Sequence, residues 1–136
     1  MNNIILHINP DGIAQLNDEH QQGVATRAQS FADLFGMGDC GRIMGLLHDK
    51  GKEQETWQKY IQGVTGYNKE YAHIKTGPNH SYVGAVIAQK QYPQIAPLIA
   101  QPIAGHHRGL YTIMIIKMKV SWISMFKKWK INTTNI

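Results

Sequence analysis

The distribution of glycine and proline constrains this chain most strongly, because these residues divide it into short segments whose apolar residues recur at helical spacing. No segment before residue 112 alternates strictly between apolar and polar residues, which is the pattern of a half-buried strand. The sequence therefore predicts an all-α fold made of several short helices.

Three helices are expected in the first half of the chain. The first follows Asp11, a candidate N-cap, and ends at Gly36 to Gly38. The second, CGRIMGLLHDK, follows the candidate cap Asp39, and the third is KEQETWQKYIQG. Their expected inward faces consist of Ile13, Leu16, His20, Val24, Phe31 and Phe35 in the first, Ile43, Met44 and Leu47 in the second, and Trp57, Tyr60 and Ile61 in the third.

Two further helices are expected after a loop at residues 63–79. The segment HSYVGAVIAQKQY restarts a helix at His80, and Pro93 stops it. The segment QIAPLIAQPIAGHH is an apolar helix that is expected to be broken or kinked at Pro97 and Pro102. It ends in the pair His106-His107.

The formal net charge of +5 belongs to the last part of the chain. Residues 1–107 contain eight Lys or Arg and nine Asp or Glu, whereas residues 108–136 contain six Lys or Arg and no acid. A surface that is basic throughout, as a nucleic-acid-coating protein would present, is therefore not supported.

Three features bear on the compartment. The one cysteine, Cys40, excludes an internal disulfide and fits a reducing compartment, so a cytoplasmic location is expected. The segment MNNIILHINPDG lacks the basic region and the long apolar run of a signal peptide. No stretch is long and uncharged enough to span a bilayer, so no membrane partner is expected.

Residues 112–136 differ in composition from the rest and are expected to form a basic tail after a domain at residues 1–111. This tail contains no Ala, Gly, Pro, Leu, Asp, Glu or Gln and is rich in Ile, Lys, Met, Asn and Thr. Two interpretations stay open. The tail is an appended basic amphipathic helix with Ile116, Val120 and Ile123 on one side, or it is a truncated, frameshifted or otherwise altered end.

Histidines occur at the ends or on the inward faces of the expected helices. His20 lies on the stripe of the first helix, and His48 and Asp49 end the second in the segment GLLHDKGK. This segment also fits an ordinary helix end, where lysines complement the helix dipole and Gly51 ends the helix. His7, near the N-terminus, and His73, in a polar loop, are expected to have no part in a site.

Taken together, these histidines suit a metal site. Neutral imidazoles and one carboxylate are good ligands for a divalent transition metal. Because a carboxylate has two oxygens, Asp49 can bridge two ions about 4 Å apart, which can clamp the attacking and leaving oxygens of a phosphoryl transfer. The order of a His-Asp pair, a histidine that opens a helix and a His-His pair favours this interpretation over separate buried histidines.

Four segments, LNDEHQQGVA, GLLHDKGK, HSYVGA and AGHHRGL, together resemble the HD nuclease domain of type I CRISPR systems, over roughly residues 13–111. That domain is the N-terminal part of the CRISPR helicase-nuclease or a separate protein that works with the helicase. The His-Asp pair alone would indicate only the wider HD phosphohydrolase superfamily. The resemblance implies an HD-domain helical bundle with metal ligands at helix ends.

The resemblance also implies an activity and a set of ligands. The family is metal-dependent and cuts single-stranded DNA exposed by the CRISPR surveillance complex, in antiviral defence, with ions of the Mn, Fe, Co or Ni type. Lys52 is a further candidate catalytic residue that could neutralise phosphate charge, beside His48 and Asp49. The implied metal ligands are His20, His48 and Asp49 for one ion, and Asp49, His80, His106 and His107 for the other.

One expected ligand is missing. The family completes its first metal site with an aspartate downstream of the His-His pair, and this chain has no acid after Glu70. The first site is therefore expected to be incomplete and the second well formed, which predicts about one tightly bound ion and weak or absent activity that rises steeply with added Mn²⁺. Two other functions stay open, namely an HD phosphohydrolase of nucleotides or small phosphate esters, and an inactive remnant that acts as a binding module.

Overall fold

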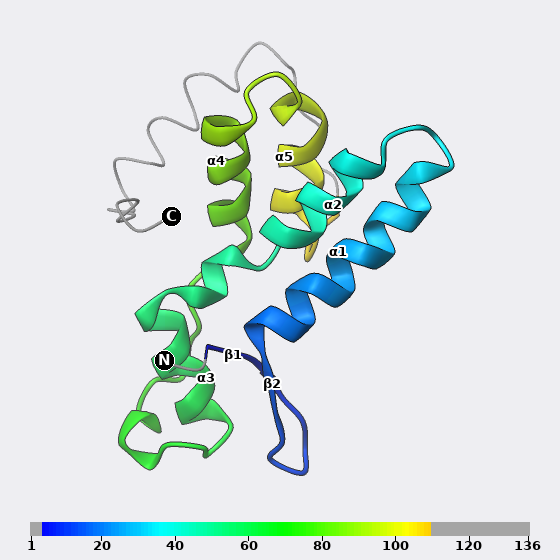
Figure 1. Cartoon of the computed structure of the whole chain (residues 1–136). Coiled ribbons are helices and arrows are strands. Elements are labelled where there is room, and N and C mark those ends of the chain that lie inside the picture. The colour runs from blue at the N-terminus through cyan, green and yellow to red at the C-terminus, as the bar shows by residue number, and fades with distance from the viewer. Residues whose placement is uncertain (1–3, 110–136) are drawn as a thin grey trace.

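The computed structural model describes residues 4–109, and these form a mostly helical molecule with one small sheet (Figure 1). The predicted all-α fold is confirmed. The interpretations of the tail at residues 112–136 lie outside the described residues. The elements are β1 Ile5–Ile8, β2 Ala14–Leu16, α1 Asn17–Asp33, α2 Gly38–Leu47, the 3-10 helix η1 Lys50–Glu53, α3 Glu55–Val64, the 3-10 helix η2 Lys69–Tyr71, α4 Ser81–Gln91 and α5 Ala96–Gly105.

An antiparallel β-hairpin precedes the first helix, so the predicted helix start after Asp11 was wrong. The turn of this hairpin is stabilised by Asn9, whose side-chain oxygen accepts a hydrogen bond of 2.7 Å from the backbone N–H of Ile13. Gly12 adopts a positive φ of 81°, which a glycine tolerates without strain. Because these residues reverse the chain, α1 begins only at Asn17.

Helices α1 and α2 form a close-packed helical hairpin (Figure 1). Gly45 of α2 lies directly on the backbone of Ala25, and a Cβ added to this glycine would overlap it. Small residues therefore form the contact between α1 and α2, and the large apolar residues of the first predicted helix do not lie in this contact. The predicted inward stripe was wrong at four positions, since Ile13, Leu16, Phe31 and Phe35 are exposed.

The main hydrophobic core lies between α4, α5 and the C-terminal end of α2. Gly84 of α4 permits this packing, because a Cβ there would overlap the carbonyl group of Leu47. Pro97 lies in the first turn of α5, which begins at Ala96, and Pro102 lies within the helix, so α5 continues past both prolines and is not broken. The predicted face of the second helix is confirmed, with Leu47 buried in this core and with Ile43 and Met44 packed against it.

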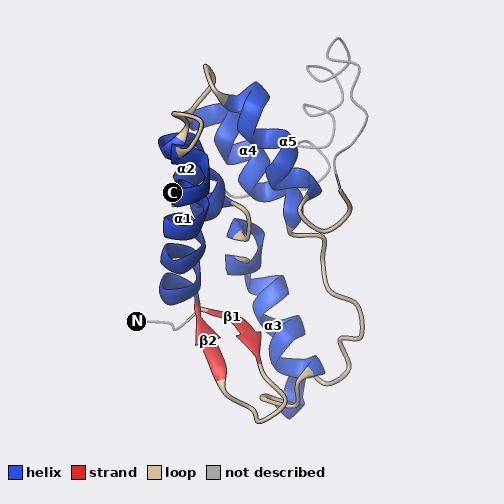
Figure 2. Ribbon diagram, turned by 90° about the vertical axis from the view of Figure 1, so that its right-hand side faces the viewer, coloured by secondary structure: helices blue, strands red, loops and turns tan. Residues whose placement is uncertain are grey.

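Helix α3 packs beside the β-hairpin (Figure 2). Trp57 is buried in α3 as predicted, and Gln58 joins the helix to β1. The Gln58 side chain accepts a 3.0 Å hydrogen bond from the N–H of Ile5 and donates a 2.8 Å bond to the carbonyl of the same residue. The hairpin is thus held against α3, and Ile5 and Leu6 are buried there.

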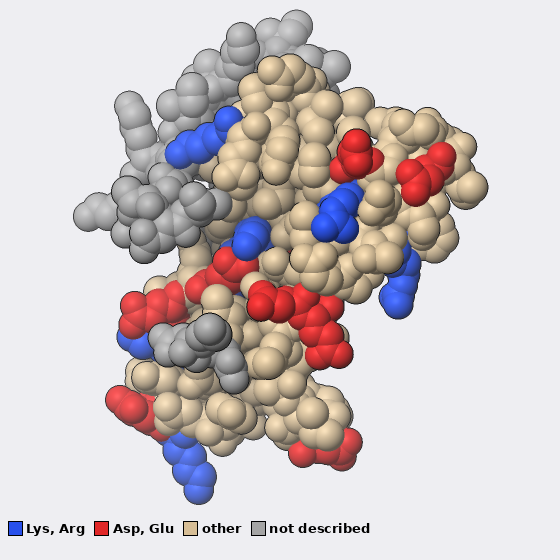
Figure 3. All heavy atoms as spheres, in the orientation of Figure 1, with Lys and Arg blue, Asp and Glu red and all other residues tan. Residues whose placement is uncertain are grey.

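None of the helices within residues 4–109 is long and apolar enough to cross a membrane. Acidic and basic side chains are interspersed on the face shown in Figure 3. This distribution agrees with the near balance of charged residues in the first 107 positions. Among the described residues on that face, no broad basic area is visible.

Candidate metal centre

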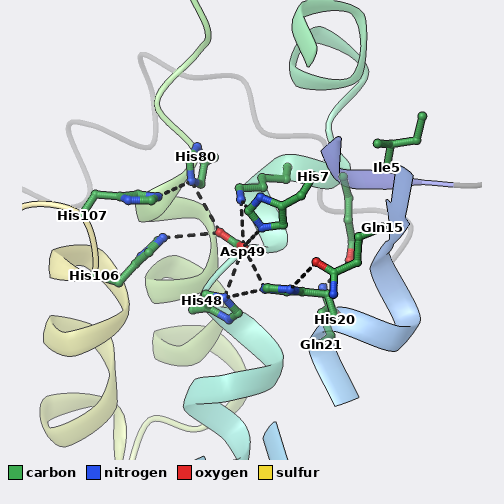
Figure 4. A network of polar contacts seen from close by, with 12 residues as sticks. Ile5, His7, Gln15, His20, Gln21, His48, Asp49, His80, His106 and His107 are labelled. Atoms are coloured by element: carbon green, nitrogen blue, oxygen red, sulfur yellow. Dashed lines mark hydrogen bonds and ion pairs between the residues drawn. The ribbon is translucent and has the colours of Figure 1, made fainter. Parts of the chain in front are cut away.

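Six of the seven histidines surround one carboxylate, that of Asp49 (Figure 4). This aspartate is only 2% exposed although aspartate is a charged residue type. The structure brings together all six of the predicted ligands, namely His20, His48, Asp49, His80, His106 and His107, and adds His7. Their service as metal ligands stays a prediction, while their convergence is a feature of the fold.

Helix ends position most of these side chains. His48 directly follows α2, His106 directly follows α5, and His80 directly precedes α4. Gly51, shortly after the end of α2, lies against the backbone of His80 at the start of α4. A Cβ on this glycine would overlap that backbone. The segment after α2 can therefore lie against the start of α4, which places Asp49 between the helices.

The two oxygens of Asp49 face different histidines. Oδ1 lies 3.5 Å from Nε2 of His80 and 3.4 Å from Nε2 of His106. His107 joins this group through its Nε2, which lies 2.8 Å from Nε2 of His80. Oδ2 faces the other group, at 3.2 Å from Nε2 of His48, 3.5 Å from that of His20 and 3.9 Å from that of His7. We call these groups the Oδ1 side and the Oδ2 side.

Hydrogen bonds at the far ring nitrogen set the tautomer of three histidines. Nδ1 of His48 donates to the carbonyl of Gly45 at 2.8 Å, and Nδ1 of His106 donates to the carbonyl of Ile103 at 2.7 Å. Nδ1 of His20 lies 3.2 Å from Oε1 of Gln15. Since these oxygens only accept, the proton of each neutral ring is on Nδ1, and Nε2 presents its lone pair to Asp49. Metal-binding imidazoles are oriented in the same manner.

Two buried atoms at the centre of the cluster have no hydrogen-bond partner among the described residues. They are Oδ1 of Asp49 and Nε2 of His106, which lie 3.4 Å apart. A buried polar atom without a partner is costly, and both of these atoms offer lone pairs. A cation between them would satisfy both, so the donor set on the Oδ1 side fits a metal ion.

Two groups of side chains have the spacing of metal ligands. In each, one ligand atom per residue lies within 4.8 Å of the others. The groups are Asp49, His80, His106 and His107 on the Oδ1 side, and His7, His20 and Asp49 on the Oδ2 side. The protein therefore contains two groups of histidines around the buried Asp49 that could hold a metal ion.

Asp49 is held in its charged form. Burial alone raises the pKa of its carboxyl, but contacts with His106 and His48 and the positive charge of Lys52 outweigh this effect. The pKa of Asp49 consequently lies well below its usual range. A carboxylate that keeps its charge while buried is suited to bind a cation.

Most of the imidazoles are held in their neutral form. Burial lowers the pKa of His80 to about 4, although the charge of Asp49 opposes this shift. Burial also lowers the pKa of His106, but its contacts with Asp49 and with the carbonyl of Ile103 outweigh burial and raise that pKa overall. The pKa values of three further rings are lowered, mainly by burial, in His7, His20 and His107.

Lys52 is buried at the centre and is not a solvated lysine at a helix end. Its side chain is 5% exposed, and its Nζ lies 3.0 Å from Oδ2 of Asp49. The same Nζ lies 3.3 Å from Nε2 of His7 and 5.3 Å from the ring centroid of Trp57. The predicted contact of Lys52 with a phosphate stays a prediction, and within the chain this lysine contacts Asp49.

His7 was wrongly excluded from the site. It lies opposite Gln15 in the hairpin, and Gln15 in turn contacts His20, so the hairpin brings residue 7 beside the start of α1. The turn sequence NPDG could have indicated this return of the chain. The exclusion of His73 agrees with the structure, where this residue is exposed and its Nδ1 contacts the carbonyl of Glu70.

Comparison with known proteins does not assign the chain to a family. No protein-family model matches it, and neither curated proteins nor solved structures yielded a significant match. The fold and the site are therefore the basis for classifying the chain. By these features it is a mostly helical protein whose histidines cluster around one buried aspartate.

Proposed function

We propose that this protein is a metal-dependent hydrolase of phosphodiester bonds that acts on single-stranded DNA, as an HD nuclease of the CRISPR type. The observation that carries the proposal is the single buried carboxylate of Asp49, with imidazole nitrogens facing both of its oxygens. A carboxylate placed in this way is suited to a metal centre for phosphoryl transfer. Single-stranded DNA is proposed as the substrate because four sequence segments resemble the HD nuclease domain.

The Oδ1 side is the better candidate for an ion. Asp49, His80, His106 and His107 would hold a divalent ion of the Mn, Fe, Co or Ni type. When bound, such an ion supplies Lewis-acid chemistry that polarises the phosphate and makes water a better nucleophile. The imidazoles contribute lone pairs in a fixed orientation, and the charge of Asp49 offsets part of the charge of the cation.

The proposal extends to partners and location. The CRISPR helicase part and the surveillance complex would deliver the single strand in the cytoplasm. The described surface has no broad basic area on the face shown in Figure 3, which is in keeping with a nuclease that relies on partners to hold its substrate.

A cleavage assay tests this function. Labelled single-stranded DNA and a set of mononucleotides are incubated with the purified chain and added Mn²⁺, beside the variants Asp49→Asn and His73→Ala. We expect the parent chain and His73→Ala to cut DNA and Asp49→Asn to be inactive, because His73 lies outside the cluster. Hydrolysis of mononucleotides alone would favour the small-ester alternative, and no hydrolysis of either substrate would overturn the proposal.

A further inference from the structure

The two sides of the Asp49 carboxylate differ in one respect that bears on the number of ions bound. On the Oδ2 side the carboxylate is paired with the ammonium of Lys52 at 3.0 Å. On the Oδ1 side the neighbours within the described residues are imidazoles, and Oδ1 has no hydrogen-bond partner there. A positive charge of the protein's own thus lies where a second metal ion would bind.

The ammonium and an ion on the Oδ2 side would need the same lone pairs. An ammonium group only donates hydrogen bonds, so Nε2 of His7 must accept from Lys52 across their 3.3 Å contact. The ligand group on this side consists of His7, His20 and Asp49. Nε2 of a neutral imidazole has one lone pair, and His7 therefore cannot bind an ion while it accepts from Lys52.

Charge also opposes a second ion while Lys52 is in place. A dication at this position would lie within a few ångströms of a buried ammonium, where water screens the repulsion poorly. The other nearby carboxylate, that of Glu53, is already engaged. Its Oε1 accepts hydrogen bonds from Asn17 at 2.9 Å, Gln21 at 2.9 Å and Lys50 at 2.8 Å.

Lys52 is held in place and is not a mobile surface chain. Its backbone N–H donates to the carbonyl of Asp49 at 2.8 Å, and its carbonyl accepts from Nε2 of Gln58 at 2.8 Å. The Trp57 ring lies against the ammonium as a cation–π partner. The backbone of Lys52 is thus fixed at both its N–H and its carbonyl, and its side chain lies between the Trp57 ring and Oδ2 of Asp49.

We propose that the ammonium of Lys52 occupies the second cation position of this centre, so that the chain binds one divalent ion on the Oδ1 side and gains a second site when Lys52 is replaced by a neutral residue. The inference rests on the proposed metal-dependent function. The second site would consist of His7, His20 and Oδ2 of Asp49, with His48 beside them.

Metal stoichiometry tests this inference without any activity assay. The metal-free chain is dialysed against Mn²⁺ or Co²⁺, and bound ions per chain are measured by elemental analysis for the parent, Lys52→Met, Lys52→Arg and Lys50→Met. We expect about one ion in the parent and about two in Lys52→Met, as in two-metal centres. Lys52→Arg, which keeps the charge, and Lys50→Met, which removes a neighbouring charge, should stay at about one.

Two further variants locate the ions. In the Lys52→Met background, His7→Ala should return the count to about one, since His7 is a ligand only of the second site. In the parent, His7→Ala should leave the bound ion and its affinity unchanged. Circular dichroism checks the fold of each variant, and Lys52→Gln replaces Lys52→Met should the latter not fold.

The other outcomes contradict the inference, or the inference together with the proposed function. Two ions in the parent, or one ion in both Lys52→Met and Lys52→Gln, would overturn the inference and leave the proposed function standing. Loss of the ion from the parent on His7→Ala would also overturn it, because the ion would then lie on the Oδ2 side. No ion in the parent or in any variant would overturn the proposed function as well.

Discussion

The Oδ1 side of Asp49 borders the hydrophobic core, whereas the Oδ2 side, apart from His48 at the end of α2, borders polar side chains. His106 follows α5, whose Ile99 and Ile103 are fully buried. On the other side, His20 belongs to α1, whose buried face includes Asn17 and Gln21. Both of these polar residues donate to Glu53, and Lys52 adds an ammonium beside Oδ2.

This difference shows how one carboxylate can have two environments. On the apolar side, burial lowers the pKa values of His80 and His107 and leaves Oδ1 of Asp49 and Nε2 of His106 without hydrogen-bond partners, which favours binding of an ion from outside. On the polar side, the protein supplies its own cation and its own hydrogen bonds. The two sides therefore need not bind a metal ion with similar affinity, although both offer imidazole nitrogens and a carboxylate oxygen.

The largest expected effect comes from Asp49→Ala, which removes the group that both sides share. Loss of the only carboxylate in the cluster should weaken metal binding by more than the roughly 100-fold that changes in outer-shell partners produce. No single histidine variant should match it. Calorimetric titration of the metal-free protein gives the affinities, with His73→Ala as the control. If His73→Ala lost the ion and Asp49→Ala kept it, the ligand assignment would be wrong.

The next largest effect is expected on stability, from a substitution in the hydrophobic core beside the Oδ1 side. Ile103→Ala should lower the free energy of unfolding by about 2–5 kcal/mol, because the side chain is 1% exposed and leaves a cavity. Phe35→Ala, at a site that is 81% exposed, should change it by less than about 0.5 kcal/mol. Denaturant unfolding of the metal-free protein measures both. Equal losses in the two variants would show that the exposed end of the α1–α2 pair is packed in solution.

A smaller effect is expected from pH in the metal-free protein. The unfolded chain protonates His80 near pH 6.5, but burial lowers the pKa of this ring in the folded chain to about 4. The unfolded state thus binds more protons between these values, and stability should fall as pH falls from 6.5 to 4. The lowered pKa values of His7, His20 and His107 act in the same direction, and the raised pKa of His106 opposes them.

Chemical denaturation at several pH values tests this dependence, and His80→Gln should make it shallower. Gln is neutral throughout this range, so the variant lacks the proton that the unfolded chain gains at position 80. A slope that is unchanged in His80→Gln would contradict the assignment of this ring as a buried neutral imidazole.

The smallest effect should follow from Gln15→Leu, which removes the acceptor of His20 Nδ1. The tautomer ratio of His20 should shift, as nitrogen chemical shifts in NMR spectra would show, while affinity for the first ion stays unchanged. An affinity loss of about 10-fold, as for outer-shell partners of true ligands, would place His20 on the bound ion. The distinction between the two sides would then be wrong.

Local sequence signals determined the helices and the helix-end residues of the site. Gly and Pro mark the ends of short apolar segments within a few residues, so His48, His80 and His106 could be placed at helix ends from the sequence. The same reasoning predicted the buried face of α2. It failed for the N-terminal segment, where the turn at Asn9 and Gly12 outweighed the helical spacing of later residues.

Only the tertiary structure decided which side chains meet around Asp49. Three glycines allow the helices to approach closely, namely Gly45 against Ala25, Gly51 against His80 and Gly84 against Leu47. Such contacts join segments that are distant in the chain, so they leave no periodic signal in a single sequence. The hydrogen bonds between Gln58 and Ile5 hold the hairpin in place, and His7 therefore lies at the site although His7 is far from Asp49 in sequence. Burial of Lys52 against Asp49 was decided in the same way, because a lysine after a helix is solvated unless other segments cover it, as β1 and α3 do here.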